Sequence, residues 1–214
     1  MSYATFNGWT IIPPPAAPCF RSLVLRMNDT VSEARSPFTA MSQVQQWPGA
    51  EWWEAEIELP PLLPRDTAAW QAWLASLQGK NNVFSIGDQN RPMPINPVSS
   101  STPVCATGGG SVNLTGATSL VTRGWRPSQA RILLPGDYLQ VGYRLHMVLQ
   151  AVTTDSSGDA TINIWPSLRE QPPDGEAIIL DKPTGLFRLA DNARSISIAV
   201  TRLAAVGFKC VEAR

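Results

Sequence analysis

The sequence is poor in charge. Only 16% of its 214 residues are Asp, Glu, Lys or Arg, and 17 basic and 17 acidic side chains leave a formal net charge of +0. A neutral chain lacks the excess of positive charge that is typical of nucleic-acid-binding proteins. The apolar share of 43% is that of a globular protein, which excludes disorder driven by charge repulsion.

Long apolar runs and cysteine pairs are also missing. No run approaches the roughly 20 residues of a membrane-spanning helix, and residues 1–8 lack the basic start and apolar core of a secretory leader. We therefore expect no membrane partner. Three scattered cysteines, Cys19, Cys105 and Cys210, form neither a disulfide framework nor the paired spacing of a zinc site.

Side chains that commonly act in catalysis are scarce as well. A triad or dyad usually recruits a histidine, and the single His146 lies in a strand-like segment where alternation favours a surface or interface position. Asp155 and Asp159 lack the closing Glu of a calcium loop, so a hairpin turn is expected there. We expect no metal, no cofactor and no enzyme. A cysteine-dependent hydrolase is the weakest alternative, because no base accompanies a thiol.

Strand patterns lie between clusters of proline. Eleven of the 19 prolines lie in four clusters, at 13–15, 60–64, 92–97 and 172–173. Proline cannot donate to a β-ladder. The clearest strand is 51–59, in which Trp53, Ala55, Ile57 and Leu59 alternate with Trp52, Glu54, Glu56 and Glu58. This period of two predicts one buried face and one wet face.

One helix is predicted over about 66–78. Apolar side chains recur there at i, i+3, i+4 and i+7, namely Trp70, Trp73, Leu74 and Leu77. Asp66 or Thr67 is expected to cap the first free N–H groups, and Gly79 to end the helix in a left-handed conformation.

The domain organisation follows from where the strands recur. Short strands at regular spacing between about 118 and 180 predict a small all-β barrel or sandwich, inserted as residues 98–183. The alternating strand at 195–201 and a last strand at 208–211 are expected to return to the first domain. The predicted fold is mainly β: a discontinuous β-sandwich of residues 1–97 and 184–214 with one flanking α-helix, carrying the insertion.

Aromatic and proline residues supply the candidate interfaces. Tryptophan is typical of interface hot spots, and prolines stiffen an N-terminal arm, residues 1–18, that we expect to dock on a neighbouring subunit. The candidates are Trp9, Pro13, Pro14, Pro15, Trp47, Trp52, Trp125 and Trp165. Exposed tryptophans also stack on sugars, so a carbohydrate-binding β-module for host-surface recognition stays open as the alternative. Glu54, Glu56 and Glu58 form either a solvated face or the negative wall of a ring bore.

Several ordered segments resemble tail-tip structural proteins of long-tailed, siphovirus-like bacteriophages. The resemblance covers most of the chain beyond Trp47, in Trp53–Leu62, Trp70–Gly79, Phe84–Asp88, Leu134–Gly142 and Asp155–Arg169. Two turns depart from that family's pattern, because Gln89 and Ser167 stand where it favours proline.

The resemblance implies a distal tail protein without catalytic activity. Such a protein forms a hexameric ring that joins the tail tube protein to the tail hub and tail-fibre proteins, with DNA passing through as cargo that does not stick. The implied location is the virion tail tip, after synthesis in the host bacterial cytoplasm. In such a ring, Glu54, Glu56 and Glu58 are the expected lumen-facing acids.

Overall fold

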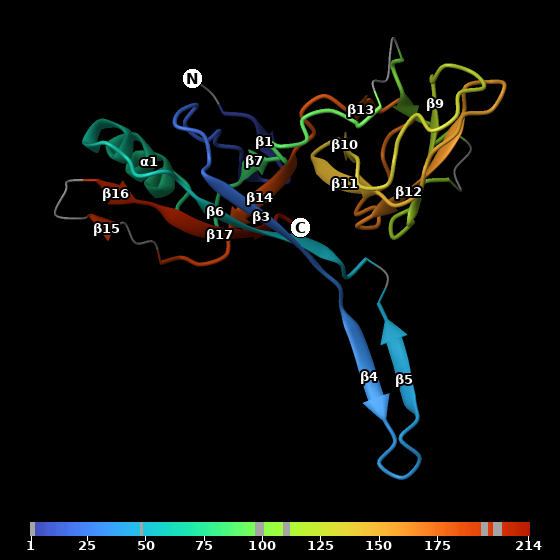
Figure 1. Ribbon diagram of the computed structural model, residues 1–214, viewed down its shortest axis with the longest axis horizontal. Helices are drawn as coiled ribbons and strands as arrows, with labels where there is room; N and C mark the ends of the chain where they lie inside the picture. The colour runs from blue at the N-terminus through green and yellow to red at the C-terminus, as the bar shows by residue number, and fades with distance from the viewer. Residues whose placement is uncertain (1–2, 48, 97–100, 109–111, 194–196, 199–202) are drawn as a thin grey trace. The chain divides into compact units, whose positions relative to one another are not determined.

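The computed structural model describes residues 3–47, 49–96, 101–108, 112–193, 197–198 and 203–214 (Figure 1). The protein is mainly β, as expected from the sequence, with one α-helix and several sheets among these residues. The chain divides into two compact units. We call Met1–Arg26, Trp53–Asp88 and Thr184–Arg214 the sheet unit, and Met27–Trp52 and Gln89–Pro183 the barrel unit.

The sheet unit is built on a five-stranded sheet. Its order is β3 (Ser22–Asn28), β6 (Trp52–Glu58), β17 (Gly207–Glu212), β14 (Gly185–Leu189) and β7 (Phe84–Ile86). Along β6, Trp53, Ala55 and Ile57 are buried, whereas the residues between them are at least partly accessible. The predicted alternation is therefore confirmed, and β17 confirms the return of 208–211 to this sheet.

One helix, α1 (Pro64–Ser76), covers the apolar face of the sheet. The predicted stripe is confirmed, because Trp70, Trp73, Leu74 and Leu77 are all buried. The Trp73 ring meets Trp70 and Phe84 edge to face, with centroids 5.3 Å and 5.0 Å apart. Such pairs add to the stabilisation that burial alone provides.

The predicted start of the helix is wrong. It begins at Pro64, with Leu63 as the N-cap and no side-chain capping bond. Proline suits this first position, since the N–H it lacks has no intrahelical partner in any case. Asp66 and Thr67 lie inside the first turn, where the Thr67 hydroxyl donates to the Leu63 carbonyl at 2.9 Å. At the other end, Gln78 and Gly79 both adopt positive φ, 51° and 70°.

The N-terminal segment packs on its own sheet unit. Two short strands, β1 (Thr5–Phe6) and β2 (Trp9–Thr10), form a hairpin whose Phe6 and Trp9 pack against a buried apolar cluster of this unit. The Ile12 N–H donates to the Val83 carbonyl at 2.8 Å, and the Ile12 side chain is buried. The expected arm over 1–18 is thereby revised, because Trp9 and the residues up to Ile12 are used within the chain.

The barrel unit holds a six-stranded sheet that nearly closes on itself. Its order is β13 (Ile178–Ile179), β10 (Tyr138–Val141), β11 (Arg144–Val148), β12 (Ala160–Trp165), β9 (Ser119–Arg123) and β8 (Val104–Cys105). The two ends meet where Cys105 N–H donates to the Glu176 carbonyl at 2.8 Å and Ile178 N–H donates to Pro103 at 3.0 Å. Closing a sheet in this way removes most of its free edge.

The barrel unit differs in extent from the predicted insertion of 98–183. It already begins at Gln89 and also includes Met27–Trp52. Hydrogen bonds explain the earlier start: the Ile95 N–H donates to the buried Asp137 carboxylate at 2.9 Å, and the Asn96 amide donates to the Arg131 carbonyl at 2.7 Å.

Two further details concern the predicted strands. Within 195–201, β15 (Ser197–Ile198) pairs with β16 (Ala204–Ala205), while the neighbouring 194–196 and 199–202 lie outside the described residues. The expected surface position of His146 is wrong. Its ring is buried, and its Nδ1 lies 2.7 Å from the Pro166 carbonyl oxygen.

Candidate functional site

Two strands, β4 (Val31–Arg35) and β5 (Ser42–Gln46), form an antiparallel pair that is hydrogen-bonded to no other described strand. We call residues 31–46 the ribbon. Its strands pair from Val31 opposite Gln46 to Arg35 opposite Ser42, and every residue of both strands is exposed. It forms its own two-stranded sheet (Figure 1). An isolated pair of strands is only marginally stable in water, and unpaired strand edges readily accept another chain.

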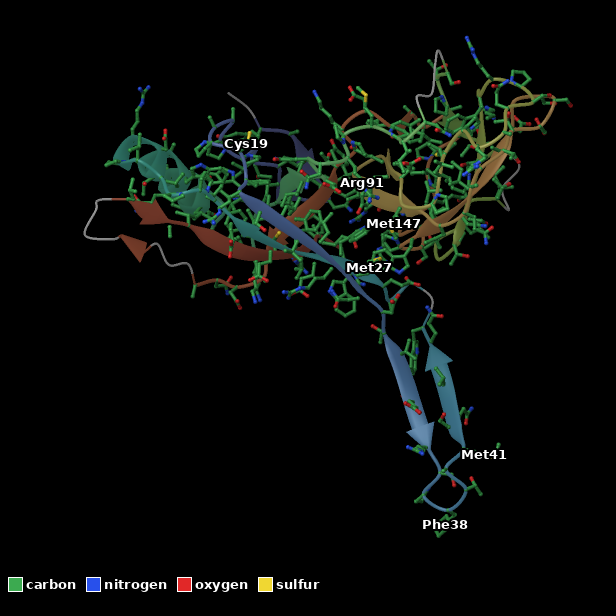
Figure 2. All side chains as sticks on the ribbon, in the orientation of Figure 1. Cys19, Met27, Phe38, Met41, Arg91 and Met147 are labelled. Atoms are coloured by element: carbon green, nitrogen blue, oxygen red, sulfur yellow. The ribbon has the colours of Figure 1, made fainter. Side chains whose placement is uncertain are left out.

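The turn of the ribbon displays apolar side chains. We call residues 36–41 the tip. Phe38 is 96% exposed and Met41 is 74% exposed, and Figure 2 shows both at the turn. The backbone is nevertheless ordered, since the Ser36 hydroxyl accepts from the N–H groups of Phe38 and Thr39, and Ser36 N–H donates to the Met41 carbonyl at 2.9 Å. The tip therefore presents an aromatic ring to solvent from a defined turn.

Polar contacts, some of them buried, fasten the base of the ribbon to the barrel. We call residues 29–30 and 49–51 the root. The Trp165 indole N–H donates to Asp29 at 3.0 Å, and the Ser167 hydroxyl donates to Glu51 at 2.9 Å. Arg169 donates to the carbonyls of Gly49 and Glu51 and lies 3.8 Å from the Glu51 carboxylate. The side chains of Arg169 and Glu51 are only 9% and 5% exposed, so this ion pair is shielded from solvent.

Three predicted interface tryptophans lie near this root. Trp47 directly follows β5 and is exposed. Trp52 is the first residue of β6 and is half-buried, and the half-buried Trp165 holds Asp29 as described. The structure thus gathers these residues around the attachment of the ribbon.

The other predicted interface residues have different positions. Trp125 as an interface residue is wrong: it is 4% exposed, packs in the barrel core and donates its indole N–H to the Thr122 hydroxyl at 2.7 Å. Pro13 is exposed, while Pro14 and Pro15 are half-buried. These prolines follow the buried Ile12, so they begin where the N-terminal segment leaves its own core.

The three acids of β6 share a sheet face with cations. Glu56 lies opposite Lys209 of β17, with the ammonium 3.7 Å from its carboxylate, and Arg26 of β3 lies 2.8 Å away on the other side. Glu54 and Glu58 lie opposite the uncharged Val211 and Gly207. The central acid is therefore neutralised by its neighbours, and the face is less negative than three aligned carboxylates suggest.

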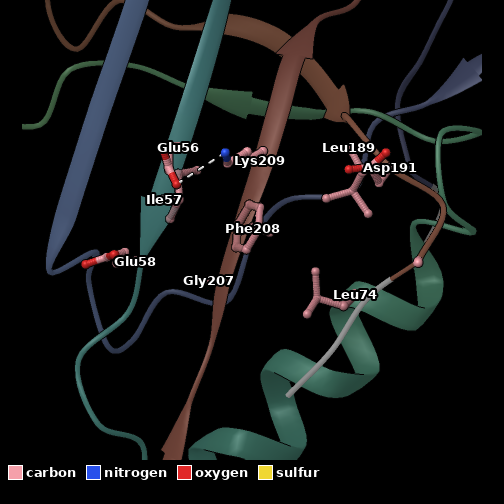
Figure 3. A pocket seen from close by; sticks show the side chains of 10 residues that line it. Glu56, Ile57, Glu58, Leu74, Leu189, Asp191, Gly207, Phe208 and Lys209 are labelled. Atoms are coloured by element: carbon pink, nitrogen blue, oxygen red, sulfur yellow. Dashed lines mark ion pairs between the residues drawn. The ribbon is translucent and has the colours of Figure 1, made fainter. Parts of the chain in front are cut away.

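A cleft of about 260 Å³ opens beside this face in the sheet unit (Figure 3). Apolar side chains of the core, Leu74, Leu189 and Phe208, line it together with the paired Glu56 and Lys209. None of the described residues that line it is His, Cys or Ser. The cleft thus offers no side chain of the usual nucleophilic or proton-transferring kinds except carboxylates and one lysine.

Two of the three thiols, those of Cys105 and Cys210, are buried in unreactive surroundings. Burial, reinforced by the nearby Glu176 and Asp174 carboxylates, raises the pKa of Cys105 to about 12. Burial likewise raises the pKa of Cys210. Both thiols stay protonated at neutral pH, whereas a catalytic cysteine needs a thiolate. Within the described ranges, no three His, Cys, Asp or Glu side chains are placed to hold a metal ion.

Comparison with protein-family models gives no match, and comparison with curated proteins gives none either. In the part of the chain that the structure describes, no helix is long and apolar enough to cross a membrane. The ribbon, missed by the sequence patterns, is the feature with the clearest need for a partner.

Proposed function

We propose that this protein is a structural component of a bacteriophage tail tip, forming a hexameric distal ring that joins the tail tube to the hub and fibres. The resemblance of its sequence segments to tail-tip proteins supplies the family. The ribbon supplies the physical reason for assembly. The ring acts by shape, without a catalytic step, and resides in the virion.

The exposed ribbon is the observation that carries this proposal. All ten strand residues that pair along it are exposed, so the chain itself buries neither face. Natural proteins protect free strand edges with charge or proline. Strand β5, with the sequence Ser-Gln-Val-Gln-Gln, has neither. A ring subunit uses such an element to pair with or pack on the next copy.

The root, with its shielded pair of Arg169 and Glu51, supports the same role. A projecting element binds well only if little conformational freedom is lost when it docks. Arg169, Glu51 and Ser167 fix the base of the ribbon, and Ser36 fixes its turn. Repeated copies then multiply modest contacts, and interfaces of roughly 800 Å² per side are enough to hold a ring together.

Charge is compatible with close packing of copies. The formal net charge is +0, so neighbouring subunits do not repel each other strongly. In the proposed ring, Glu54, Glu56 and Glu58 border the lumen, and passing DNA meets a face on which Glu56 is already paired with Arg26 and Lys209. Such a face offers DNA no net positive charge to bind.

A carbohydrate-binding module is the second candidate, favoured by the exposed Trp47. Of the eight tryptophans, all of which the structure describes, Trp47 is the exposed one, Trp9, Trp52 and Trp165 are half-buried, and Trp53, Trp70, Trp73 and Trp125 are buried. A sugar platform usually uses stacking faces that solvent can reach. One exposed ring is a weaker basis than the whole ribbon.

Light scattering of the purified chain tests the proposal. We expect a mass that corresponds to a hexamer of 23.2-kDa chains, and rings in electron micrographs. A variant in which a short Gly-Ser turn replaces residues 31–46 should stay monomeric with an unchanged circular-dichroism spectrum in the remaining β-structure. A wild-type chain that stays monomeric and binds glycans would instead support the second candidate.

A further inference from the structure

An apolar groove lies on the barrel unit. It has a volume of about 340 Å³ and is lined by Met93, Pro94, Pro103, Ile178 and Leu180. Met93 is 62% exposed, so the groove opens to solvent. A groove of this kind buries an apolar side chain well, because the lining offers few competing polar groups.

The groove carries one charge, and so does the end of the ribbon. Asp181 is the one charged side chain among the described residues that line the groove. Arg35 forms the last rung of the ribbon, opposite Ser42, and the tip between these two residues has no charged side chain. The aromatic side chain of Phe38 is thus accompanied by a positive charge, and the apolar groove by a negative one.

The tip is free to meet such a groove on another copy. Phe38 is 96% exposed, so its own chain leaves it uncovered. When the tip of one copy binds the groove of the next, the resulting pair of copies still has one unoccupied groove and one unoccupied tip. Contacts of this heterologous type continue from copy to copy and close into a ring when the rotation permits.

We infer that Phe38 of one copy inserts into the groove of a second copy, with Arg35 facing Asp181. This inference rests on the ring proposed above and specifies the contact that joins its subunits. Phe38 acts as the hot spot, because a large aromatic ring enters a pocket and becomes fully desolvated. The charged pair sets the orientation in which the tip enters.

Substitution of the tip tests the hot spot. In Phe38→Ser, the concentration at half-assembly, measured by light scattering of the full chain, should rise by about 30-fold or more. Leu114→Ser is the matched control, because Leu114 is also an exposed apolar residue but lies outside both the ribbon and the groove. The effect of this control should be no more than about threefold. Equal assembly of Phe38→Ser and wild type would overturn the inference while leaving the ring intact.

Charge reversal tests the partner. Arg35→Asp and Asp181→Arg should each weaken assembly. The double variant should regain most of the assembly, because it again has opposite charges at positions 35 and 181, with the two signs exchanged. Both residues are exposed, so these variants are expected to fold, as thermal unfolding can verify. Failure of the double variant to recover any assembly lost by the single variants would contradict the pairing of these two residues.

A mixing experiment separates this contact from a symmetric one. Met93→Asp damages the groove but keeps the tip, and Phe38→Ser does the reverse. Each variant alone should stay monomeric, whereas an equimolar mixture should form a complex of one copy of each and no larger species. Leu149→Asp, at another exposed apolar position of the barrel unit, is the control for Met93→Asp and should assemble normally.

A photo-reactive phenylalanine analogue at position 38 identifies the occupant directly. We expect cross-links between copies to residues 93–94 or 178–181. Cross-links elsewhere in a second copy overturn the groove as the site but leave self-assembly standing. A monomeric wild-type chain whose tip binds phosphatidylcholine vesicles, with binding lost in Phe38→Ser, overturns both the inference and the self-assembled ring.

Discussion

Replacing Arg169 with Met should destabilise the barrel unit strongly. Arg169 donates to the Gly49 carbonyl at 2.8 Å and lies 3.8 Å from the buried Glu51 carboxylate. Met preserves the apolar stem but removes the charge, which leaves Glu51 buried without its cation. Breaking a buried pair in this way costs about 3–5 kcal/mol. Urea unfolding followed by circular dichroism should show a loss of that size in the free energy of unfolding.

An exposed ion pair provides the matched control. Arg26 lies 2.8 Å from Glu56, closer than Arg169 lies to Glu51, but the two side chains are 49% and 34% exposed. Solvent screens such pairs, so Arg26→Met should cost no more than about 1 kcal/mol. The shorter distance therefore belongs to the weaker interaction. Equal losses in the two variants would refute the claim that burial decides the strength of the root.

A second substitution separates two parts of this loss. One is the attraction between Arg169 and Glu51, and the other is the cost of keeping the Glu51 carboxylate buried when Arg169 is replaced. Adding Glu51→Leu to Arg169→Met removes the carboxylate that the first change leaves behind. The double variant should recover part of the lost stability, since apolar replacement of a whole buried pair is often neutral. The Ser167 hydroxyl then loses its acceptor, and an unsatisfied buried hydroxyl costs about 1–3 kcal/mol, so recovery should be incomplete.

Three further predictions use other parts of the chain. Trp125→Ala should lower the free energy of unfolding by about 3–5 kcal/mol, because it leaves a cavity in the barrel core. Trp47→Ala should change that free energy by less than about 1 kcal/mol, because Trp47 is exposed; urea unfolding of both variants measures the difference. A thiol reagent at pH 8 should modify Cys19 alone in the folded chain, because Cys19 is exposed whereas Cys105 and Cys210 are buried, and the raised pKa of Cys105 lies far above that pH. Mass spectrometry of the labelled protein counts the modified cysteines. The N–H groups of Asp159 and Ser157 donate to the Asp155 carboxylate and lower its pKa, so the stability it contributes is present above the ordinary carboxyl pKa and is lost as the pH falls through the folded value. The protection factors of residues 155–159, that is, the observed exchange rates divided into the intrinsic rates at each pH, should therefore fall below about pH 4 in the wild type but not in Asp155→Ala.

The sequence predicts those elements that bury one face against the rest of the chain. Strand β6 and helix α1 carry apolar residues at periods of two and of three to four, because each buries one face, including Trp53 on the strand and Trp70 on the helix. The start of α1 is harder to place, since Pro64 begins a helix without the capping side chain that usually announces it. Periodicity therefore located the core but not each boundary.

The sequence patterns do not predict the ribbon, and the reason is that periodicity appears only where one face is buried. Neither face of β4 or β5 is buried, so no apolar alternation is required, and the sequence from Val31 to Gln46 has none. The signal that was present is Ser36-Pro37 followed by Phe38, a turn that places an aromatic residue outside any apolar stripe. For Trp125 the error is the reverse, since the sequence analysis expects it at an interface and the structure buries it. A lone tryptophan between loop residues has no periodicity from which its burial can be inferred.

Exposure of the ribbon is itself an argument for assembly. A two-stranded sheet gains little from its own ladder and loses backbone entropy for every residue it orders. The root contacts from Trp165, Ser167 and Arg169 hold its base, yet none of them reaches the tip, where Phe38 and Met41 remain in water. Apolar side chains that gather at the end of an ordered, exposed element are typical of an interaction site. In the ring that we propose, the groove of the next copy, with its apolar lining and Asp181, has the chemistry to bury these side chains.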